Sequence, residues 1–198
     1  SSDLTGIEIN NREQLPVSTL VLAIGHSARD TFSLLEKTGC SMQAKSFAVG
    51  LRIEHPQTLI NQYQYGCKEH DTLGAAAYKL THKAASGRGI YSFCMCPGGY
   101  VVNASSEKNM LAVNGMSYQD RASKNANSAM IVTVTPDDYG NKGPLSGVEF
   151  QRELERTAYG LGGGKIPLQL FGDFKENRRS TGLGLVTPDR KSTRLNSS

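Results

Sequence analysis

The feature that most constrains the fold is a nearly continuous apolar run, VSTLVLAIG, at residues 17–25. It is bounded by Pro16 and Gly25 and contains β-branched residues but no alternation of polar and apolar positions. Such a run is typical of a strand that is buried on both faces, as in a parallel sheet. The next segment, ARDTFSLLEKTG, has apolar residues on one side and predicts a helix over residues 28–38, with Gly39 as its C-cap. The chain is therefore predicted to begin with a strand-turn-helix unit of an α/β domain.

Beyond this unit the pattern changes to short strands separated by polar or glycine-rich turns. The patterns predict strands at residues 46–55, 89–95, 99–105, 110–117 and 126–135, a strand or irregular segment at 76–83, and helices at 56–66 and 146–161. One further short strand is predicted before the unit, at residues 6–11. Pro56 is predicted to open the first of these helices, and Ser146 to be the N-cap of the second. The three strands between residues 89 and 117 have the appearance of an antiparallel meander. This order indicates an α/β domain with a second, β-rich domain inserted after it.

The turn after the predicted buried strand is a candidate ligand site. In an open α/β sheet, ligands bind where a strand ends and a helix begins, because backbone N–H groups and the helix dipole face outward there. Here Gly25 ends the strand, Ser27 is a candidate N-cap, and Asp30 lies in the first helical turn. A strand-to-helix turn without a ligand uses the same residue types, so the spacing alone leaves both interpretations open.

The last ten residues, DRKSTRLNSS, resemble one translated frame of a common short-read sequencing adapter, and we expect residues 189–198 to be an artefact. Without them, Lys and Arg fall from 22 to 19 and Asp and Glu from 18 to 17, so the net charge falls from +4 to +2. This small excess does not favour nucleic-acid binding. No apolar run approaches the roughly 18 residues of a membrane span. Because a starting Met and a signal segment are also absent, we expect a fragment of a longer protein.

Two of the four cysteines lie in the segment FCMCPGG, residues 93–99. The cysteine spacing is not that of a disulfide framework, which favours a reducing, cytoplasmic compartment. Zinc would need two more ligands beside Cys94 and Cys96, and because no second close pair exists we expect no metal site. By alternation both thiols are predicted to point into a core, with a strained, redox-active pair as the alternative. The following glycines either form a hairpin turn or let the backbone approach a planar ligand.

The best polar cluster lies in LRIEHPQ, where Arg52 and Glu54 share one face of a strand and His55 follows. One interpretation is a structural ion pair between Arg52 and Glu54. The other is that Arg52 binds an anion or a substrate carboxylate while His55 donates a proton. His26, directly after Gly25, is an alternative acid or base.

Several segments together resemble a flavoprotein family. VLAIGHSARDTF is similar to the strand that passes beside the flavin in two-dinucleotide-fold flavoproteins. LAIGHSARDTF, FAVGLRIEHPQ, FCMCPGGYVVNASSE, VNGMS and NANSAMIVTV, in this order, resemble the family of uncharacterised FAD-dependent dehydrogenases of bacteria and plastids. The resemblance covers residues 17–174.

The resemblance implies an α/β protein whose inserted part is α+β. It implies the end of an FAD-binding Rossmann-like domain at residues 1–30, an inserted substrate or cap domain of mixed, largely antiparallel β structure with helices at 31–170, and a truncated return toward the FAD domain at 171–188. The implied cofactor is FAD, with NAD(P)H as a candidate electron donor. The implied cofactor-binding residues are Ala23, Ile24, Gly25, His26, Ser27, Arg29, Pro97, Gly98, Gly99, Asn114 and Gly115, and the candidate catalytic residues are Arg52, His55 and Cys96.

The chain also departs from the flavoprotein pattern. It contains no GxGxxG turn for the FAD pyrophosphate, and LGGGK at residues 161–165 follows a helix and is not continued by Ser or Thr. We therefore expect the isolated fragment to bind FAD weakly or not at all and to be inactive. For the full-length parent, the sequence favours an FAD-dependent oxidoreductase acting on a small molecule. The alternative is a non-catalytic flavin- or nucleotide-binding module with a structural cofactor.

Overall fold

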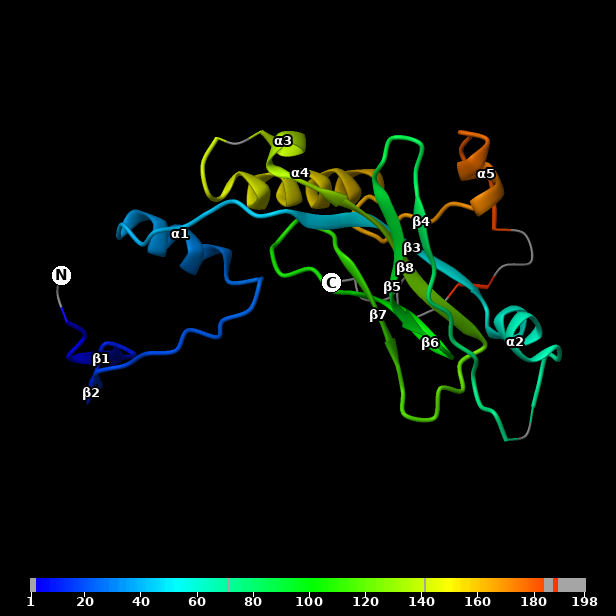
Figure 1. Cartoon of the computed structure of the whole chain (residues 1–198), viewed down its shortest axis with the longest axis horizontal. Helices are drawn as coiled ribbons and strands as arrows, with labels where there is room; N and C mark the ends of the chain where they lie inside the picture. The colour runs from blue at the N-terminus through cyan, green and yellow to red at the C-terminus, as the bar shows by residue number, and fades with distance from the viewer. Residues whose placement is uncertain (1–2, 71, 141, 184–186, 189–198) are drawn as a thin grey trace. The chain divides into compact units, whose positions relative to one another are not determined.

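The computed structural model describes residues 3–70, 72–140, 142–183 and 187–188 (Figure 1), and the suspected adapter segment at 189–198 lies outside them. The chain divides into two units, Ser1–Cys40 and Ser41–Ser198. The predicted domain assignment, which divides the chain after residues 30, 170 and 188, stays a prediction.

The first unit contains one hairpin and one helix. Strands β1 (Gly6–Ile9) and β2 (Glu13–Pro16) pair antiparallel, and only the first of them was predicted. Helix α1 (Arg29–Lys37) confirms the helix predicted over residues 28–38. Its C-cap is Thr38 and not Gly39 as predicted; Gly39 comes next, with φ +84°, and donates its N–H to Glu36 O.

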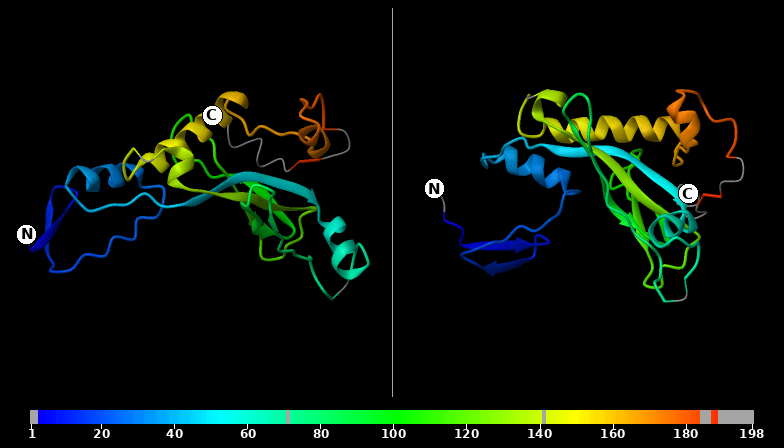
Figure 2. Two further views of the ribbon diagram at one scale, coloured as in Figure 1. Left: turned by 45° about the horizontal axis from the view of Figure 1, so that its top comes forward. Right: turned by 45° about the vertical axis from the view of Figure 1, so that its right-hand side comes forward.

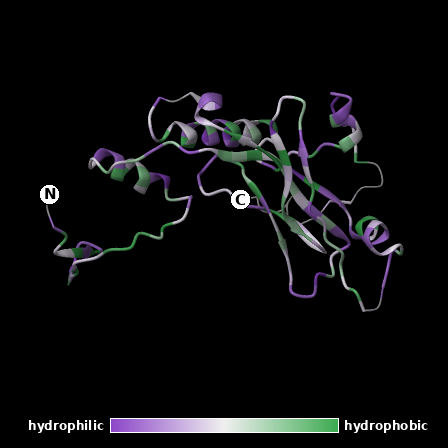
Figure 3. Ribbon diagram, viewed as in Figure 1, coloured by the Kyte–Doolittle hydropathy of each residue, from purple (hydrophilic) through white to green (hydrophobic). Residues whose placement is uncertain are grey.

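The strand predicted at residues 17–25 is wrong for this structure. Among the described residues, no strand pairs with this segment, and Figure 3 shows it as an apolar stretch of irregular chain. Its large apolar side chains from Leu20 to Ile24 are exposed, from 40% for Ile24 to 83% for Val21. A strand forms only by hydrogen-bonding to at least one neighbouring strand, and the described residues of this unit supply only a separate two-stranded hairpin. The apolar run is therefore extended but unpaired.

The second unit is built on a four-stranded antiparallel sheet (Figure 1). Its order is β3 (Phe47–Pro56), β8 (Asn125–Val134), β5 (Gly89–Cys96) and β4 (Thr81–Lys83). A second, two-stranded sheet pairs β6 (Gly99–Asn103) with β7 (Val113–Ser117). The predicted strands are thus largely confirmed, with only Thr81–Lys83 forming a strand in the segment 76–83.

The pairing of these strands differs from the predicted meander. Strand β5 pairs with β4 and β8, and β6 pairs with β7, so the chain leaves one sheet at residues 97–98 and enters another. Every strand pair among the described residues is antiparallel. The fold is therefore mixed α/β with antiparallel sheets.

The helices confirm most of the local predictions. Helix α2 (Gln57–Tyr65) follows Pro56, which is its N-cap rather than its first residue, and ends at Gly66 with φ +77°. Helix α4 (Ser146–Leu161) has Leu145, not Ser146, as its N-cap, because the Ser146 hydroxyl donates to Gly143 O instead. Two short helices were not predicted, α3 (Pro136–Tyr139) and α5 (Phe171–Lys175).

Helix α4 lies along the four-stranded sheet in both views of Figure 2. The contact is aromatic: the rings of Phe47 and Phe150 are 6.2 Å apart and those of Phe47 and Tyr139 are 5.4 Å apart. Gly147 permits this approach, because a Cβ there would lie 2.9 Å from the Phe47 ring. Among the helices that the structure describes, none is long and apolar enough to cross a membrane.

Candidate functional site

The main polar cluster lies where the β6–β7 sheet packs against β3, β5 and β8. We call it the Arg52 cluster; it consists of Arg52, Cys96, Asn114, Gly115 and Asn127. Sequence reasoning had singled out four of its members as site candidates, and the fold brings these four together from three strands, β3, β5 and β7. Asn127 is the member that it missed.

Arg52 is half-buried and donates three hydrogen bonds to neutral oxygen acceptors. Its Nη1 donates to Asn127 Oδ1 at 2.6 Å and to Cys94 O at 3.2 Å, and its Nη2 donates to Asn114 Oδ1 at 3.2 Å. The alternative ion pair with Glu54 is not formed; Glu54 Oε1 accepts from Asn125 Nδ2 at 2.6 Å. Among the described residues, no carboxylate pairs with Arg52. The guanidinium charge is thus held by dipoles alone.

Asn127 and Gly115 fix the position of this guanidinium. Asn127 is fully buried, and its amide orientation follows from Arg52, because a flipped amide would set two donors against each other. Its Nδ2 is left without a partner among the described residues. A Cβ on Gly115 would lie less than 3.0 Å from Asn127 Oδ1, Arg52 Nη1 and Cys96 Sγ. Only glycine therefore leaves room for the three groups to meet.

The two thiols lie differently from the prediction. Cys96 is buried, as expected, but Cys94 is exposed, so alternation along β5 does not place both in the core. The reason is an irregularity in the pairing of β5 with β8 between Phe93 and Cys96. Cys94 there adopts φ +47°, a left-handed conformation that is uncommon for a residue other than glycine. Burial raises the pKa of the Cys96 thiol and Cys94 adds to this, whereas Arg52 opposes it.

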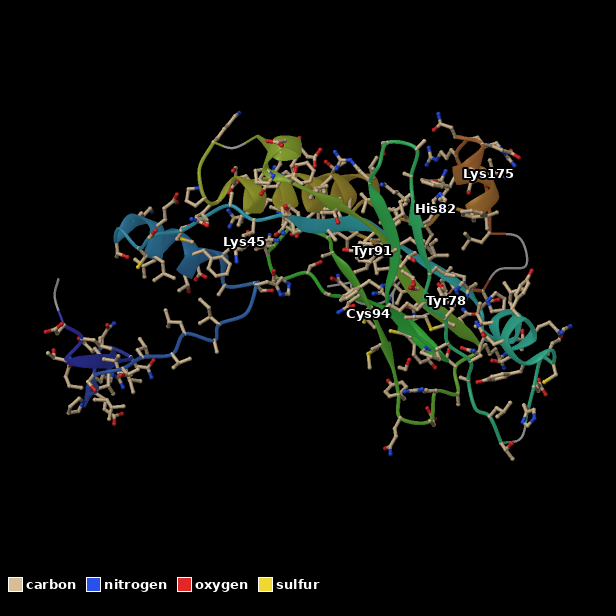
Figure 4. All side chains as sticks on the ribbon, in the orientation of Figure 1. Lys45, Tyr78, His82, Tyr91, Cys94 and Lys175 are labelled. Atoms are coloured by element: carbon tan, nitrogen blue, oxygen red, sulfur yellow. The ribbon has the colours of Figure 1, made fainter. Side chains whose placement is uncertain are left out.

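His55 lies on the opposite face of β3 from Arg52, three residues along the strand. Its Nε2 is 2.8 Å from the hydroxyl of Tyr78 (Figure 4 labels Tyr78). Burial lowers the pKa of His55 and raises that of Tyr78. The structure therefore does not combine Arg52 and His55 into the single clamp and proton donor that the sequence suggested.

The turn at Pro97, Gly98 and Gly99 is buried. Gly98 has φ +48°, and its N–H donates to Gln57 Oε1 at 2.7 Å. A Cβ on Gly98 would collide with the backbone of Arg121, and one on Gly99 would lie 2.6 Å from the Ser117 hydroxyl. The close approach predicted at this turn is made to the chain's own residues, so in this structure the turn does not fit a planar cofactor. A cofactor contact at these residues stays a prediction.

The remaining predicted cofactor residues lie in the first unit. Ala23, Ile24, Gly25, His26 and Ser27 are exposed, and Arg29 is buried at the start of α1. Ser27 is not the N-cap; Ala28 takes that place and makes no side-chain cap. Gly25 has φ +72° with no atom within 4 Å of a Cβ position. This open glycine turn before a nine-residue helix fits the approach of a cofactor, in contrast to the filled turn at 97–99.

The remaining candidates for a site are a metal-binding group and a surface hollow. Among the described residues, no three His, Cys, Asp or Glu side chains are placed to hold a metal ion. A shallow hollow of about 470 Å³ lies at the β4–β5 hairpin, and Figure 4 labels His82 and Tyr91 at its wall. It is lined by Thr81, His82, Lys83, Gly87, Gly89, Ile90 and Tyr91.

The missed residues Asn127 and Tyr78 carried weak sequence signals. NANSAM places polar residues at the start of an otherwise apolar strand, which indicates buried polar side chains that are hydrogen-bonded. Tyr78 lies in a segment without clear periodicity, and nothing in the sequence connects it to His55.

Comparison with known proteins places this chain beside flavin-dependent proteins. A family model described as "FAD-dependent protein, C-terminal domain-like" matches residues 46–197, which include the whole Arg52 cluster. An uncharacterized protein of Clostridium beijerinckii is 54% identical over 182 residues. That alignment covers 90% of this chain and 34% of the relative, so the chain spans about a third of the relative's length.

Proposed function

This chain belongs to the FAD-dependent protein, C-terminal domain-like family, and from that membership we propose that it is part of an FAD-dependent oxidoreductase whose Arg52 cluster binds an anionic group of the substrate. The family match supports the cofactor. The observation that carries the substrate class is a half-buried guanidinium without a carboxylate partner among the described residues. Buried charges are normally paired, since desolvation is costly.

The donors that remain on Arg52 suit a carboxylate. A guanidinium has five N–H donors in a planar fork. Three are engaged by Asn114, Asn127 and Cys94 O, which leaves Nε–H and one Nη2–H without an acceptor among the described residues. Planar oxyanions take two such donors at once, with short charge-assisted bonds. Arg52 would therefore hold the substrate carboxylate and orient the rest of the molecule.

The neighbours of Arg52 would hold its guanidinium in position before a carboxylate binds. Asn114 and Asn127 hold the guanidinium by their amide oxygens, so binding costs little reorganisation. Gly115 leaves the space in which these groups meet. Cys96 stays a neutral thiol near neutral pH, because burial raises its pKa, and so it does not compete with the anion for Arg52.

We place the cofactor contacts of this chain at the open turn of Gly25, His26 and Ser27. When bound, FAD supplies the two-electron redox chemistry. In the longer protein, the unpaired apolar segment at residues 17–25 would become a strand of the nucleotide-binding sheet and bring this turn to the flavin. Burying Leu20, Val21 and Leu22 there would contribute about 1.5–3 kcal/mol per side chain, which offsets the cost of ordering the segment.

The test uses the longer protein that contains this chain. We expect it to purify yellow, with the absorbance bands of bound FAD, and we expect NADH or NADPH to bleach these bands under anaerobic conditions. Bleaching by neither nucleotide, nor by any of a panel of small carboxylic acids, would instead favour a module with a structural flavin. Colourless protein that added FAD does not reconstitute would overturn the proposal.

A further inference from the structure

The segment around Cys94 departs from regular strand geometry in a way that concerns both thiols. The pairing of β5 with β8 runs to Phe93 and Ala129 and resumes at Cys96 and Asn127, so β5 has one residue more than β8 in this stretch. In a regular strand, residues two apart are separated by about 6.5–7 Å, at or beyond the Cα distance that a disulfide spans. The bulge and the left-handed Cys94 shorten the path between the two residues.

The two thiols differ in their exposure to solvent. Cys94 is exposed on β5 (Figure 4) and is open to reagents from solvent. Cys96 is buried, and its Sγ–H donates to Cys94 O at 3.3 Å, so its sulfur already lies against the Cys94 residue. Arg52 Nη1 donates to the same carbonyl oxygen and also lies close to Cys96 Sγ, since both atoms converge on the Cβ position of Gly115. Arg52 opposes the rise in the pKa of Cys96 that burial causes.

We propose that Cys94 and Cys96 form a reversible disulfide, with Cys94 as the thiol that reacts first and Cys96 as the resolving thiol. The oxidant is a peroxide. The Cys94 thiolate attacks one peroxide oxygen and the O–O bond breaks, which gives Cys94 sulfenic acid and, after protonation of the leaving oxygen, one water. Cys96 then loses its proton, its sulfur attacks the Cys94 sulfur, and the S–O bond breaks to release a second water. In sum, two thiols lose two electrons and two protons, and one hydrogen peroxide becomes two waters.

This reaction is independent of the proposed oxidoreductase activity but acts on the same cluster. Closing the disulfide removes the Cys96 S–H that now donates to Cys94 O and changes the backbone of the bulge. Because Arg52 also donates to this carbonyl oxygen, oxidation would alter how the guanidinium is held. The thiol pair is thereby a redox-sensitive element beside Arg52.

The test maps thiols in the reduced 198-residue chain after treatment with hydrogen peroxide, alkylation and trypsin digestion. Cleavage after Arg88 and Lys108 leaves both thiols in one peptide, residues 89–108. We expect this peptide to lose two hydrogens and both alkylation sites, and to regain them after dithiothreitol. Cys40, which is also exposed, is the internal control and should not acquire an intramolecular partner.

Two variants separate the steps. In Cys96→Ser, Cys94 should stop at sulfenic acid, which dimedone traps. In Cys94→Ser, the buried Cys96 should keep its thiol at the same peroxide concentration. The proposal is overturned if the wild-type peptide keeps both thiols while Cys40 is oxidised, or if Cys94 pairs with Cys40 or Cys67 instead. The wild-type measurement stands even if a variant fails to fold.

Discussion

Replacing Gly115 by alanine tests the packing of the Arg52 cluster. The new methyl group would lie less than 3.0 Å from Asn127 Oδ1, Arg52 Nη1 and Cys96 Sγ, so at least one of them must move. Overpacking of a closed site costs about 1–3 kcal/mol. Losing a hydrogen bond to a charged group costs about 1.5–3 kcal/mol more. We therefore expect Gly115→Ala to lower the free energy of unfolding of the second unit by about 2.5–6 kcal/mol.

The assay is native-state hydrogen exchange of the β7 and β8 amides, because it reports the second unit alone in a chain of two units. The matched control is Gly89→Ala, which is also in a strand but has no atom within 4 Å of its Cβ position. That change should stay within about 0.5 kcal/mol of the wild type. Equal protection in the two variants would refute the reasoning, since it would mean that the cluster is not closed around Gly115.

Three further predictions concern a helix and two titrations. Gly160→Ala, in helix α4 with open space at its Cβ position, should stabilise the second unit by about 0.5–1 kcal/mol in the same exchange assay. The Arg88 guanidinium holds the pKa of Asp138 well below its usual 3.8, so Arg88→Gln should raise that pKa toward 3.8 in an NMR titration; an unchanged value would contradict the pairing. Burial lowers the pKa of His55 below 6.5, so the unfolded state takes up this proton first as the pH falls. Its contribution to the free energy of unfolding is therefore fully present above pH 6.5 and declines below it, and urea unfolding of His55→Gln should lack this decline.

Structure determined by nearby residues was predicted well from the sequence. Helix α1 ends where Gly39 takes a left-handed conformation, and α2 begins after Pro56 and ends at Gly66. These signals act through residues within one turn of each other, and so they survive in any surrounding. The strands β3 and β8 were also predicted; β8 has consecutive β-branched residues at 131–134, whereas β3 has only Val49 and Ile53.

Structure that depends on residues far apart in the sequence was not predicted well. The apolar run at residues 17–25 has the pattern of a buried strand, but a strand exists only with a neighbour, and the described residues offer it none. The exposure of Cys94 depends on how β5 pairs with β8, which no pattern within β5 contains. Asn127 joins Arg52 across 75 residues of sequence, so its role became visible only when the sheet was formed.

The most direct test of the account is a titration of the Arg52 Nε–H resonance of the 198-residue chain with sodium succinate at constant ionic strength. The account predicts a saturable shift of the Arg52 resonance that is absent in Arg52→Gln. The shift should be retained in Arg88→Gln, because Arg88 of the wild type is already paired with Asp138. No shift beyond that caused by an equal ionic strength of sodium chloride would contradict the assignment of the Arg52 cluster as a carboxylate site.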